Sequence, residues 1–200
     1  MKFIRHLLIE TVNVIFSVMV AVLLFVALRH YVIQPFQVDG QSMSLTLANG
    51  EHMFLMKQTS IERFDVIVFP DPQGSSNSYV KRLIGLPGER LYVQNDQLYI
   101  NDIPIEEPYL EPLKSQSAAP FTQDFSLYDT IGTHTIPEGY YFVMGDNRPG
   151  SGDSRQFGLV PINSIQGEAN LVYYPFNHFR TLPKYVLDAG LEQAIQERKE

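Results

Sequence analysis

Hydrophobic residues are concentrated at one end of this chain. Residues 11–28 read TVNVIFSVMVAVLLFVAL without a charged side chain, and Arg29 and His30 end the run. A helix of about 18 residues spans roughly 27 Å, close to the ~30 Å hydrocarbon core of a bilayer. The run lacks the polar face of a core helix and the small-residue cleavage site of a removable targeting segment. The pattern predicts a transmembrane anchor over residues 11–30, after a short N-terminal segment, 1–10.

The charges beside the anchor predict its orientation. Lys2 and Arg5 precede the apolar run, and Arg29 follows it. Positively charged flanks tend to stay on the cytoplasmic side of a membrane. We therefore expect a single-pass protein with a cytoplasmic N-terminus and the rest of the chain on the extracytoplasmic side.

After the anchor, short runs of β-branched and aromatic residues recur and end at Gly, Pro, Asn or Asp. They predict strands at 32–38, 52–57, 65–69, 78–84, 90–94, 97–100, 140–145 and 169–174. Asn95 and Asp96 form the two-residue turn of a predicted hairpin. Few helical periods lie between these runs, so we predict one mainly β domain over residues 31–183.

Two segments depart from the strand pattern. Residues 104–137 are rich in Pro, Ser and Thr and are interpreted as an insertion or lid within the β domain. Residues 184–200 are predicted to be a polar C-terminal tail, with a marginal helix over 184–199.

Composition excludes several classes of protein. The 200 residues include no cysteine, which excludes disulfide scaffolds, thiol catalysis and cysteine-ligated zinc. The net charge of −7 does not favour a nucleic-acid partner. His52, His134 and His178 do not have the spacing of metal ligands, so we expect no metal and no cofactor.

One serine and one lysine are candidates for a hydrolytic pair. Residues 40–44 (GQSMS) resemble a nucleophile elbow around Ser42 but lack its second glycine. Lys81 lies in a predicted strand whose alternation places Tyr79, Lys81 and Leu83 on one face. A lysine desolvated by such neighbours can act as the base for a serine. Most strand lysines reach solvent instead, so spacing alone leaves both interpretations open.

Four motifs in order resemble the conserved boxes of the bacterial type I signal peptidases, the membrane-bound Ser/Lys leader peptidases. They are VDGQSMSLTL (38–47), FDVIVF (64–69), YVKRLIGLPGERL (79–91) and GDNRPGSGDSRQFGLVP (145–161). The resemblance implies a signal-peptidase-like antiparallel β catalytic domain on one N-terminal transmembrane helix in the bacterial cell membrane. It also implies a serine endopeptidase that removes signal peptides from secretory preproteins at the lipid bilayer, without cofactor, metal or nucleic acid.

The resemblance assigns a role to individual residues. Ser42 matches the nucleophile and Lys81 the general base. Ser151 matches the serine that hydrogen-bonds the lysine ammonium and orients it. The other supporting residues are expected to form a polar network, with Asp146 paired to Arg82: Asp146, Arg82, Asp153 and Arg155.

The substrate is expected to lie extended against the backbone near residues 37–40 and 78–81, as an added strand. Small pockets would then select Ala-x-Ala-like ends. The predicted substrate-binding residues are Gln37, Val38, Asp39, Gly40, Met43 and Tyr79, of which Met43 is expected to form part of the wall.

Three departures from the family pattern leave an alternative open. Leu45 stands where proline is usual, which is expected to loosen the turn after Ser42. Gly40 stands where some members have a serine that helps to bind the oxyanion, so backbone N–H groups, chiefly that of Ser42, would do this. Pro149 and Gly150 replace the commoner Asp-Asn.

The alternative is a non-cleaving assembly factor for surface structures such as pili. The presence of both Ser42 and Lys81 argues against it. A self-cleaving Ser/Lys repressor is a third hypothesis, and the predicted anchor counts against that one.

Overall fold

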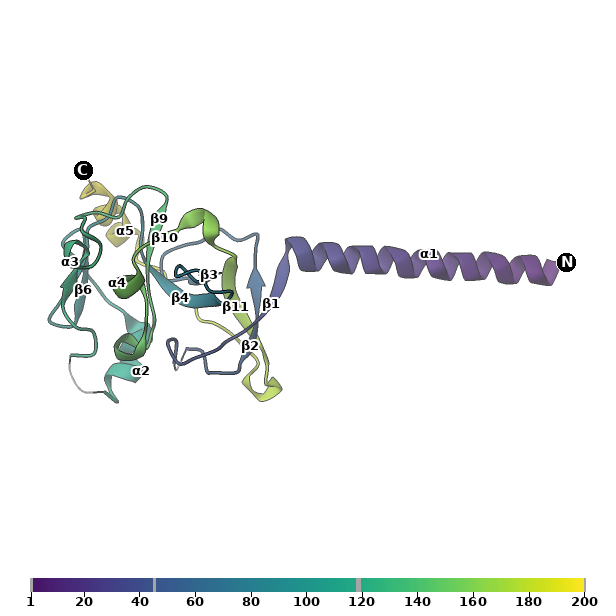
Figure 1. The fold of residues 1–200 in the computed structure, drawn as a ribbon, viewed down its shortest axis with the longest axis horizontal. Helices are drawn as coiled ribbons and strands as arrows, with labels where there is room; N and C mark the ends of the chain where they lie inside the picture. Colours follow the sequence, from purple (N-terminus) through teal and green to yellow (C-terminus); the bar gives the residue numbers. More distant parts are fainter. Residues whose placement is uncertain (1, 45, 118–119, 200) are drawn as a thin grey trace.

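The computed structural model describes residues 2–44, 46–117 and 120–199, so the predicted effect of Leu45 lies outside the described residues. The N-terminal apolar run forms one long helix, α1 (Lys2–Tyr31), which projects away from the rest of the chain (Figure 1). Its side chains from Phe3 onward are exposed, and it is long and apolar enough to cross a membrane. The predicted apolar helix is confirmed, and it also takes in most of residues 1–10.

Side-chain hydrogen bonds hold the end of α1 against the β domain. A single residue lies between α1 and the first strand, β1 (Ile33–Gln37). Lys57 Nζ donates to the carbonyl oxygen of His30 at 3.2 Å, and Gln58 Nε2 donates to that of Tyr31 at 3.2 Å. A helix C-terminus leaves its last carbonyls without helical partners, and these two donors satisfy two of them. The joint between helix and domain is therefore short and braced.

The larger sheet has eight strands in the order β1-β2-β11-β3-β4-β9-β10, with β12 added beside β11. Every pairing in it is antiparallel. Its other strands are β2 (His52–Met56), β3 (Val66–Pro70), β4 (Ser78–Gly85), β9 (Tyr140–Met144), β10 (Val160–Pro161), β11 (Gly167–Tyr174) and β12 (Arg180–Thr181). The predicted mainly β domain is confirmed. β10 and β12 were not predicted, because two residues are too short to show alternation.

The smaller sheet has the order β7-β6-β5-β8 and lies at the end of the domain far from α1 (Figure 1). Its strands are β5 (Leu91–Gln94), β6 (Gln97–Ile100), β7 (Ile103–Ile105) and β8 (Phe125–Ser126). Asn95 and Asp96 have φ angles of 53° and 62°, as a two-residue hairpin turn with left-handed centres requires. Asn101 and Asp102 repeat this chemistry between β6 and β7, with φ angles of 49° and 64°.

Residues 104–137, interpreted as an insertion or lid, contribute to the core of the smaller sheet. Without residues 118 and 119, which are not described, they contain β7, β8 and three short helices: η1 (Pro108–Leu110), α2 (Glu111–Lys114) and α3 (Leu127–Ile131). Tyr109, Leu110 and Leu127 are buried in the same cluster as Leu98 and Ile100. This packing makes the described part of the segment integral to the domain.

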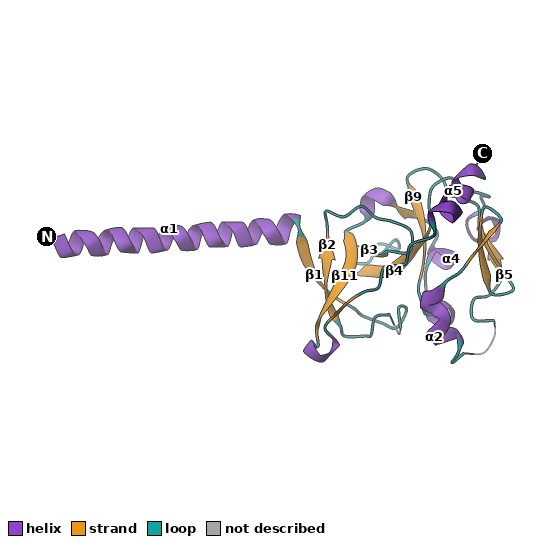
Figure 2. Cartoon of the chain, turned by 180° about the vertical axis from the view of Figure 1, so that it is seen from behind, coloured by secondary structure: helices purple, strands orange, loops and turns teal. Residues whose placement is uncertain are grey.

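The C-terminal segment also folds onto the smaller sheet (Figure 2). It contains α5 (Ala189–Glu197), which is shorter than the helix predicted over 184–199. Ile195 is completely buried, and Asn101 Nδ2 donates to its carbonyl oxygen at 2.8 Å. Glu192 lies 3.1 Å from Arg63, which also pairs with the buried Glu89. The segment predicted as a polar tail thus packs against the core.

Candidate active site

Ser42 lies in a loop between β1 and β2, residues 38–51, called here the Ser42 loop. Two backbone hydrogen bonds close its base. The N–H of Val38 donates to Glu51 at 2.8 Å, and the carbonyl of Val38 accepts from Gly50 at 2.9 Å. The loop is therefore a protrusion from the edge of the larger sheet, with Ser42 near its tip.

Gly40 shapes the approach to Ser42. Its φ of +98° is left-handed, a conformation that glycine adopts without strain and other residues rarely adopt. Its N–H donates to Asn49 Oδ1 at 2.8 Å. A serine at position 40 would be strained in this conformation, which accounts for the glycine found there.

Lys81 lies on β4, and its side chain contacts that of Ser42. Lys81 is 4% exposed, and its Nζ lies 2.7 Å from Ser42 Oγ, within hydrogen-bonding distance. The ammonium also lies 5.4 Å from the centre of the Tyr79 ring, as the predicted alternation requires. Burial lowers the pKa of the Lys81 ammonium to about 8, although Asp153 and Asp146 act in the opposite direction. Near neutral pH a useful fraction of Lys81 is therefore uncharged and able to accept the Ser42 proton.

Asp146 and Arg82 form the predicted pair behind Lys81. Arg82 Nε and Nη2 donate to the two carboxylate oxygens of Asp146 at 2.8 and 2.6 Å, and both side chains are buried. Thr46 Oγ1 donates to the same carboxylate at 2.5 Å. The pair therefore ties β4 and the β9 end to the Ser42 loop.

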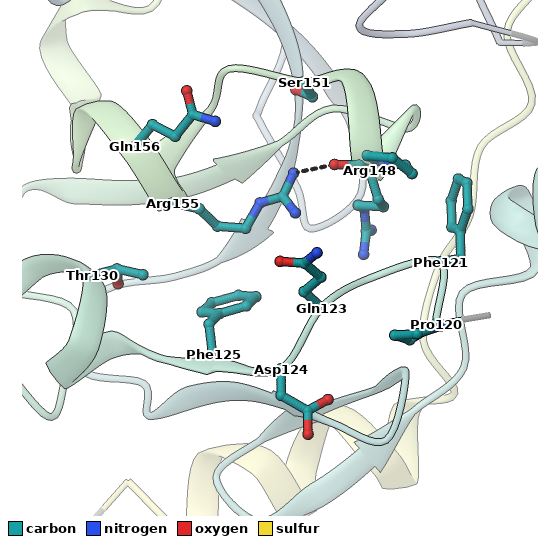
Figure 3. A pocket seen from close by; sticks show the side chains of 11 residues that line it. Pro120, Phe121, Gln123, Asp124, Phe125, Thr130, Arg148, Ser151, Arg155 and Gln156 are labelled. Atoms are coloured by element: carbon teal, nitrogen blue, oxygen red, sulfur yellow. Dashed lines mark hydrogen bonds between the residues drawn. The ribbon is translucent and has the colours of Figure 1, made fainter. Parts of the chain in front are cut away.

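Asp153 and Arg155 form the second predicted pair. Arg155 Nε and Nη2 donate to the Asp153 oxygens at 2.8 and 2.7 Å, and the N–H of Gly145 donates to Asp153 at 3.0 Å. Burial acts to raise the pKa of Asp153, but the hydrogen bonds and charge of Arg155 outweigh it and lower that pKa. Arg155 Nη2 also donates to the Arg148 carbonyl at 2.8 Å (Figure 3). Asp153 is thus held as a carboxylate that organises the loop from residue 145 to 155.

The hydrogen bond expected between Ser151 and Lys81 is not formed among the described residues. Ser151 is buried, and its Oγ has no hydrogen-bond partner there. The hydroxyl lies instead against Gly145, where an added Cβ would collide with Ser151 Oγ and with the Ser42 carbonyl oxygen. Gly145 was not singled out from the sequence, yet close approach of the Ser42 loop requires a residue without a side chain.

A cleft of about 450 Å³ runs past Ser42 and Lys81. It is lined by two stretches of chain and two glycines of the opposite loop: Phe36, Gln37, Asp39, Gly40, Gln41, Ser42, Asn77, Ser78, Tyr79, Val80, Lys81, Gly150 and Gly152. Gln37, Asp39, Gly40 and Tyr79, predicted to bind substrate, are among them. The cleft leads directly to the Ser42 hydroxyl.

Val38 and Met43, also predicted to bind substrate, do not line this cleft. They are 2% and 1% exposed and belong to the apolar cluster between the loop and the larger sheet. Their assignment to substrate stays a prediction, because it concerned the backbone at Val38 and the wall of the site at Met43. The turn of the Ser42 loop directs both side chains into the core. They support the loop from beneath.

A separate cavity of about 330 Å³ lies on the other side of the loop at residues 149–152. Figure 3 shows Ser151 and Arg155 at one wall and Phe125 and Gln123 at the other. The loop thus divides two cavities, since Gly150 and Gly152 line the first and Ser151 lines the second.

Two further contacts stabilise the site and were not predicted. The N–H of Asn147 donates to the Ser42 carbonyl at 3.0 Å, and its Nδ2 donates to Gln41 at 3.1 Å. Arg148 is buried and pairs with Glu107, which lies in the segment interpreted as a lid. The GDNR motif marks Asn147 and Arg148 but gives no signal for Glu107.

The described residues contain no group of three or more His, Cys, Asp or Glu side chains that could hold a metal ion. A hydroxyl beside an amine of lowered pKa is an arrangement suited to nucleophilic attack on a carbonyl.

Comparisons with known proteins agree with this chemistry. The sequence model of the family described as "Signal peptidase, peptidase S26" matches residues 10–174. Signal peptidase I of Bacillus caldolyticus is 42% identical over 165 residues, which cover 80% of this chain and 90% of that protein. Signal peptidase I U of Bacillus subtilis (strain 168) is 41% identical over 180 residues, which cover 86% of this chain and 91% of that protein.

One solved structure extends the similarity to the fold. The crystal structure of a signal peptidase I from Enterococcus faecalis V583 is similar with a TM-score of 0.53 and 45% sequence identity. The match covers 55% of this chain and 97% of that chain.

Proposed function

Because the chain belongs to the S26 signal peptidase family, it is a serine endopeptidase that removes signal peptides, and we propose that Ser42 and Lys81 carry its chemistry. Its substrates are preproteins that carry a signal peptide. The main support for these two residues is the distance of 2.7 Å between Lys81 Nζ and Ser42 Oγ. The lowered pKa of Lys81, about 8, supports the role of base.

In the first step, neutral Lys81 accepts the proton of Ser42 as Oγ attacks the carbonyl carbon of the scissile bond. The Lys81 ammonium then gives this proton to the leaving amine, which is the new N-terminus of the mature protein. The signal peptide remains as an ester on Ser42. Water, deprotonated by the again neutral Lys81, attacks the ester and frees both the signal peptide and Ser42.

The oxyanion of each tetrahedral intermediate requires hydrogen-bond donors. We assign this role to backbone N–H groups, chiefly that of Ser42, because Gly40 has no side chain to contribute. Asn147 supports this assignment, since its Nδ2 donates to the Gln41 carbonyl at 3.1 Å, and this carbonyl belongs to the same peptide plane as the Ser42 N–H.

The substrate lies extended in the cleft and adds a strand to β4. β3 pairs with one edge of β4 along residues 78–82, whereas β9 pairs with the other edge only from Arg82 onward. Within the described residues, no strand occupies that second edge at residues 78–81. Gln37, Asp39 and Gly40 form the opposite wall. Ala-x-Ala-like ends are preferred, in keeping with the family resemblance of the motifs around the cleft.

α1 anchors the protein in the bacterial cell membrane, with the N-terminus in the cytoplasm and the catalytic domain outside. The absence of cysteine makes this orientation straightforward to test. A single cysteine at the exposed Ser75 should react with a membrane-impermeant maleimide in intact cells, whereas one at the exposed His6 should not. Labelling of the His6→Cys variant alone would reverse the assigned orientation.

The proposed nucleophile is tested with the full chain in detergent and a purified preprotein. The wild type should release a mature protein with one defined N-terminus, read by mass spectrometry. Ser42→Ala should lower turnover by about 10⁴-fold or more, because the attacking oxygen is lost. Ser44→Ala is a matched control on the same loop, and its turnover should stay near that of the wild type.

Substantial cleavage by Ser42→Ala would exclude Ser42 as nucleophile. Failure of the wild type to cleave any preprotein would favour the alternative of a non-cleaving assembly factor. The short Ser42–Lys81 contact does not favour that alternative.

A further inference from the structure

The segment after the matched family region returns to the active site. The S26 family match ends at residue 174, and β12 then pairs back onto β11, with Arg180 opposite Val172. This pairing directs the Arg180 side chain to the Ser42 loop, to which it donates three hydrogen bonds. A part of the chain that the motifs do not cover therefore contacts the loop that carries the nucleophile.

Arg180 joins two points of the Ser42 loop. Its Nη1 and Nη2 donate to the two oxygens of the Glu51 carboxylate at 2.7 and 2.8 Å, and Nη2 also donates to the Thr46 carbonyl at 2.8 Å. Glu51, at the base of the loop, is 2% exposed and also accepts from the N–H of Ala48. One planar guanidinium thus ties the base of the loop to its middle, a geometry that a lysine cannot reproduce.

Thr46 connects Arg180 to the residues around the nucleophile. The side chain of Thr46 donates to Asp146, which is paired with Arg82 next to Lys81 on β4. Its carbonyl is the acceptor for Arg180, so Thr46 is held from two opposite sides. Ser42 lies four residues earlier in the same loop, so a shift of Thr46 changes the position of Ser42 relative to Lys81.

We propose that Arg180 is a positioning residue for peptide-bond cleavage, which holds the Ser42 loop at the distance from Lys81 that proton transfer needs. The proposal rests on the proposed role of Ser42 and adds to it a residue outside the family motifs. Arg180 does not line the cleft, so its loss acts on turnover and leaves substrate binding unchanged. Misplacement of a nucleophile by about 1 Å can lower a rate about 100-fold.

The test uses the full chain in detergent and a preprotein substrate. Arg180→Ala should lower kcat by about 10-fold or more while KM changes by less than about twofold. The pH midpoint of kcat should stay near that of the wild type, because Tyr79, Asp146 and Asp153, which also surround Lys81, lie outside the Ser42 loop. Guanidinium ion at millimolar concentration should restore part of the kcat of Arg180→Ala, since it can occupy the site between Glu51 and Thr46.

Arg180→Lys keeps the positive charge opposite Glu51. It provides a second test in case Arg180→Ala does not fold. It should lose kcat almost as strongly as Arg180→Ala, because an ammonium cannot bridge Glu51 and the Thr46 carbonyl together. Arg90→Ala, which removes the exposed ion pair with Asp102, is the control and should leave kcat unchanged.

Two outcomes would overturn the proposal. The first is a kcat within twofold of the wild type for a folded Arg180→Lys variant. The second is a rise of KM at constant kcat for Arg180→Ala, which would place Arg180 in substrate binding. Ser42→Ala, measured in parallel, separates these results from failure of the proposed nucleophile.

Discussion

β4 and the β5–β6 hairpin are both buried, but β4 buries two charged side chains in addition to apolar ones. β4 places Lys81 and Arg82 next to each other at 4% and 1% exposure. In the hairpin, Leu98 and Ile100 are at 1% and 0%. Burial of apolar surface stabilises a fold, whereas burial of a charge lowers stability unless a partner compensates it. The larger sheet therefore carries the proposed reactive groups, whereas the buried side chains of the hairpin contribute stability alone.

The two charged side chains on β4 differ in how well a partner compensates their charge. Arg82 has a bidentate partner in Asp146, and this pair braces the site. Lys81 has a neutral hydroxyl as its close partner, and burial keeps its pKa low. A carboxylate bonded directly to Lys81 would stabilise the ammonium and remove the base. The weak compensation at Lys81 is thus a requirement of its proposed role as base.

The largest effect is expected from Lys81→Arg. A guanidinium does not give up its proton in a protein, so turnover should fall about 10³-fold or more at every pH. Wild-type turnover should rise with pH through about 8 and level off above it, because Lys81 acts only when neutral. Initial rates of preprotein cleavage from pH 6 to 10 measure the loss of turnover in Lys81→Arg and the pH dependence of the wild type.

Folding of the Lys81→Arg variant is checked by circular dichroism, and Lys57→Arg, at the base of α1, serves as the control lysine. Activity of Lys81→Arg near the wild-type level would show that Lys81 acts only as a charge.

The next largest effect is expected from Ile100→Ala in the smaller sheet. This substitution should lower the stability of the fold and leave the cleavage rate unchanged. Ile100 is completely buried in an apolar cluster, and its truncation should lower the free energy of unfolding by about 2–5 kcal/mol. Well below the melting temperature, kcat and the pH midpoint should match the wild type. Thermal unfolding and cleavage rates test the two halves of this expectation. A large loss of kcat in the folded variant would show that the two regions are coupled.

The smallest of the three effects is a gain of stability from Lys81→Met. The drop of the Lys81 pKa from 10.5 to about 8 corresponds to about 3 kcal/mol against the folded state. Below pH 8 Lys81 is protonated in both folded and unfolded chains, so this cost is fully present. Between pH 8 and 10.5 the unfolded chain holds more protons, and wild-type stability rises with pH.

Lys81→Met removes this cost and should stabilise the protein by up to about 3 kcal/mol near pH 7. The gain should shrink toward pH 10.5, and chemical denaturation at several pH values measures it. A variant that is less stable than the wild type at pH 7 would show that the Lys81 ammonium is well compensated.

The sequence predicts local features of this fold well. Alternating β-branched and aromatic residues mark the strands of both sheets that are four residues or longer, and Asn95 with Asp96 marks the first tight turn. The order of the motifs predicts that Ser42 and Lys81 form a pair, and the two side chains are in contact although 39 positions separate them in the sequence. The Asp146–Arg82 pair was also expected, because each partner lies in a recognisable motif.

Contacts between distant segments without a motif could not be predicted. Glu107 pairs with Arg148 from 41 residues away, and Arg180 reaches Glu51 from 129 residues away. Neither pairing leaves a periodic signal in the sequence, since each depends on how loops fold over the sheets. The burial of the Val38 side chain could not be predicted either, because strand alternation does not continue into the turn of the Ser42 loop.

The braced joint between α1 and β1 has a consequence for which bonds the enzyme can reach. A single residue separates them, and Lys57 and Gln58 hold the helix end, so we expect the cleft to keep a constant distance from the end of the proposed anchor. The helix is about 45 Å long and the hydrocarbon core is about 30 Å thick, so its insertion depth would set the distance of the cleft from the membrane surface. We therefore expect the proposed anchor to favour cleavage sites at a particular distance from the bilayer, in addition to any preference for their side chains.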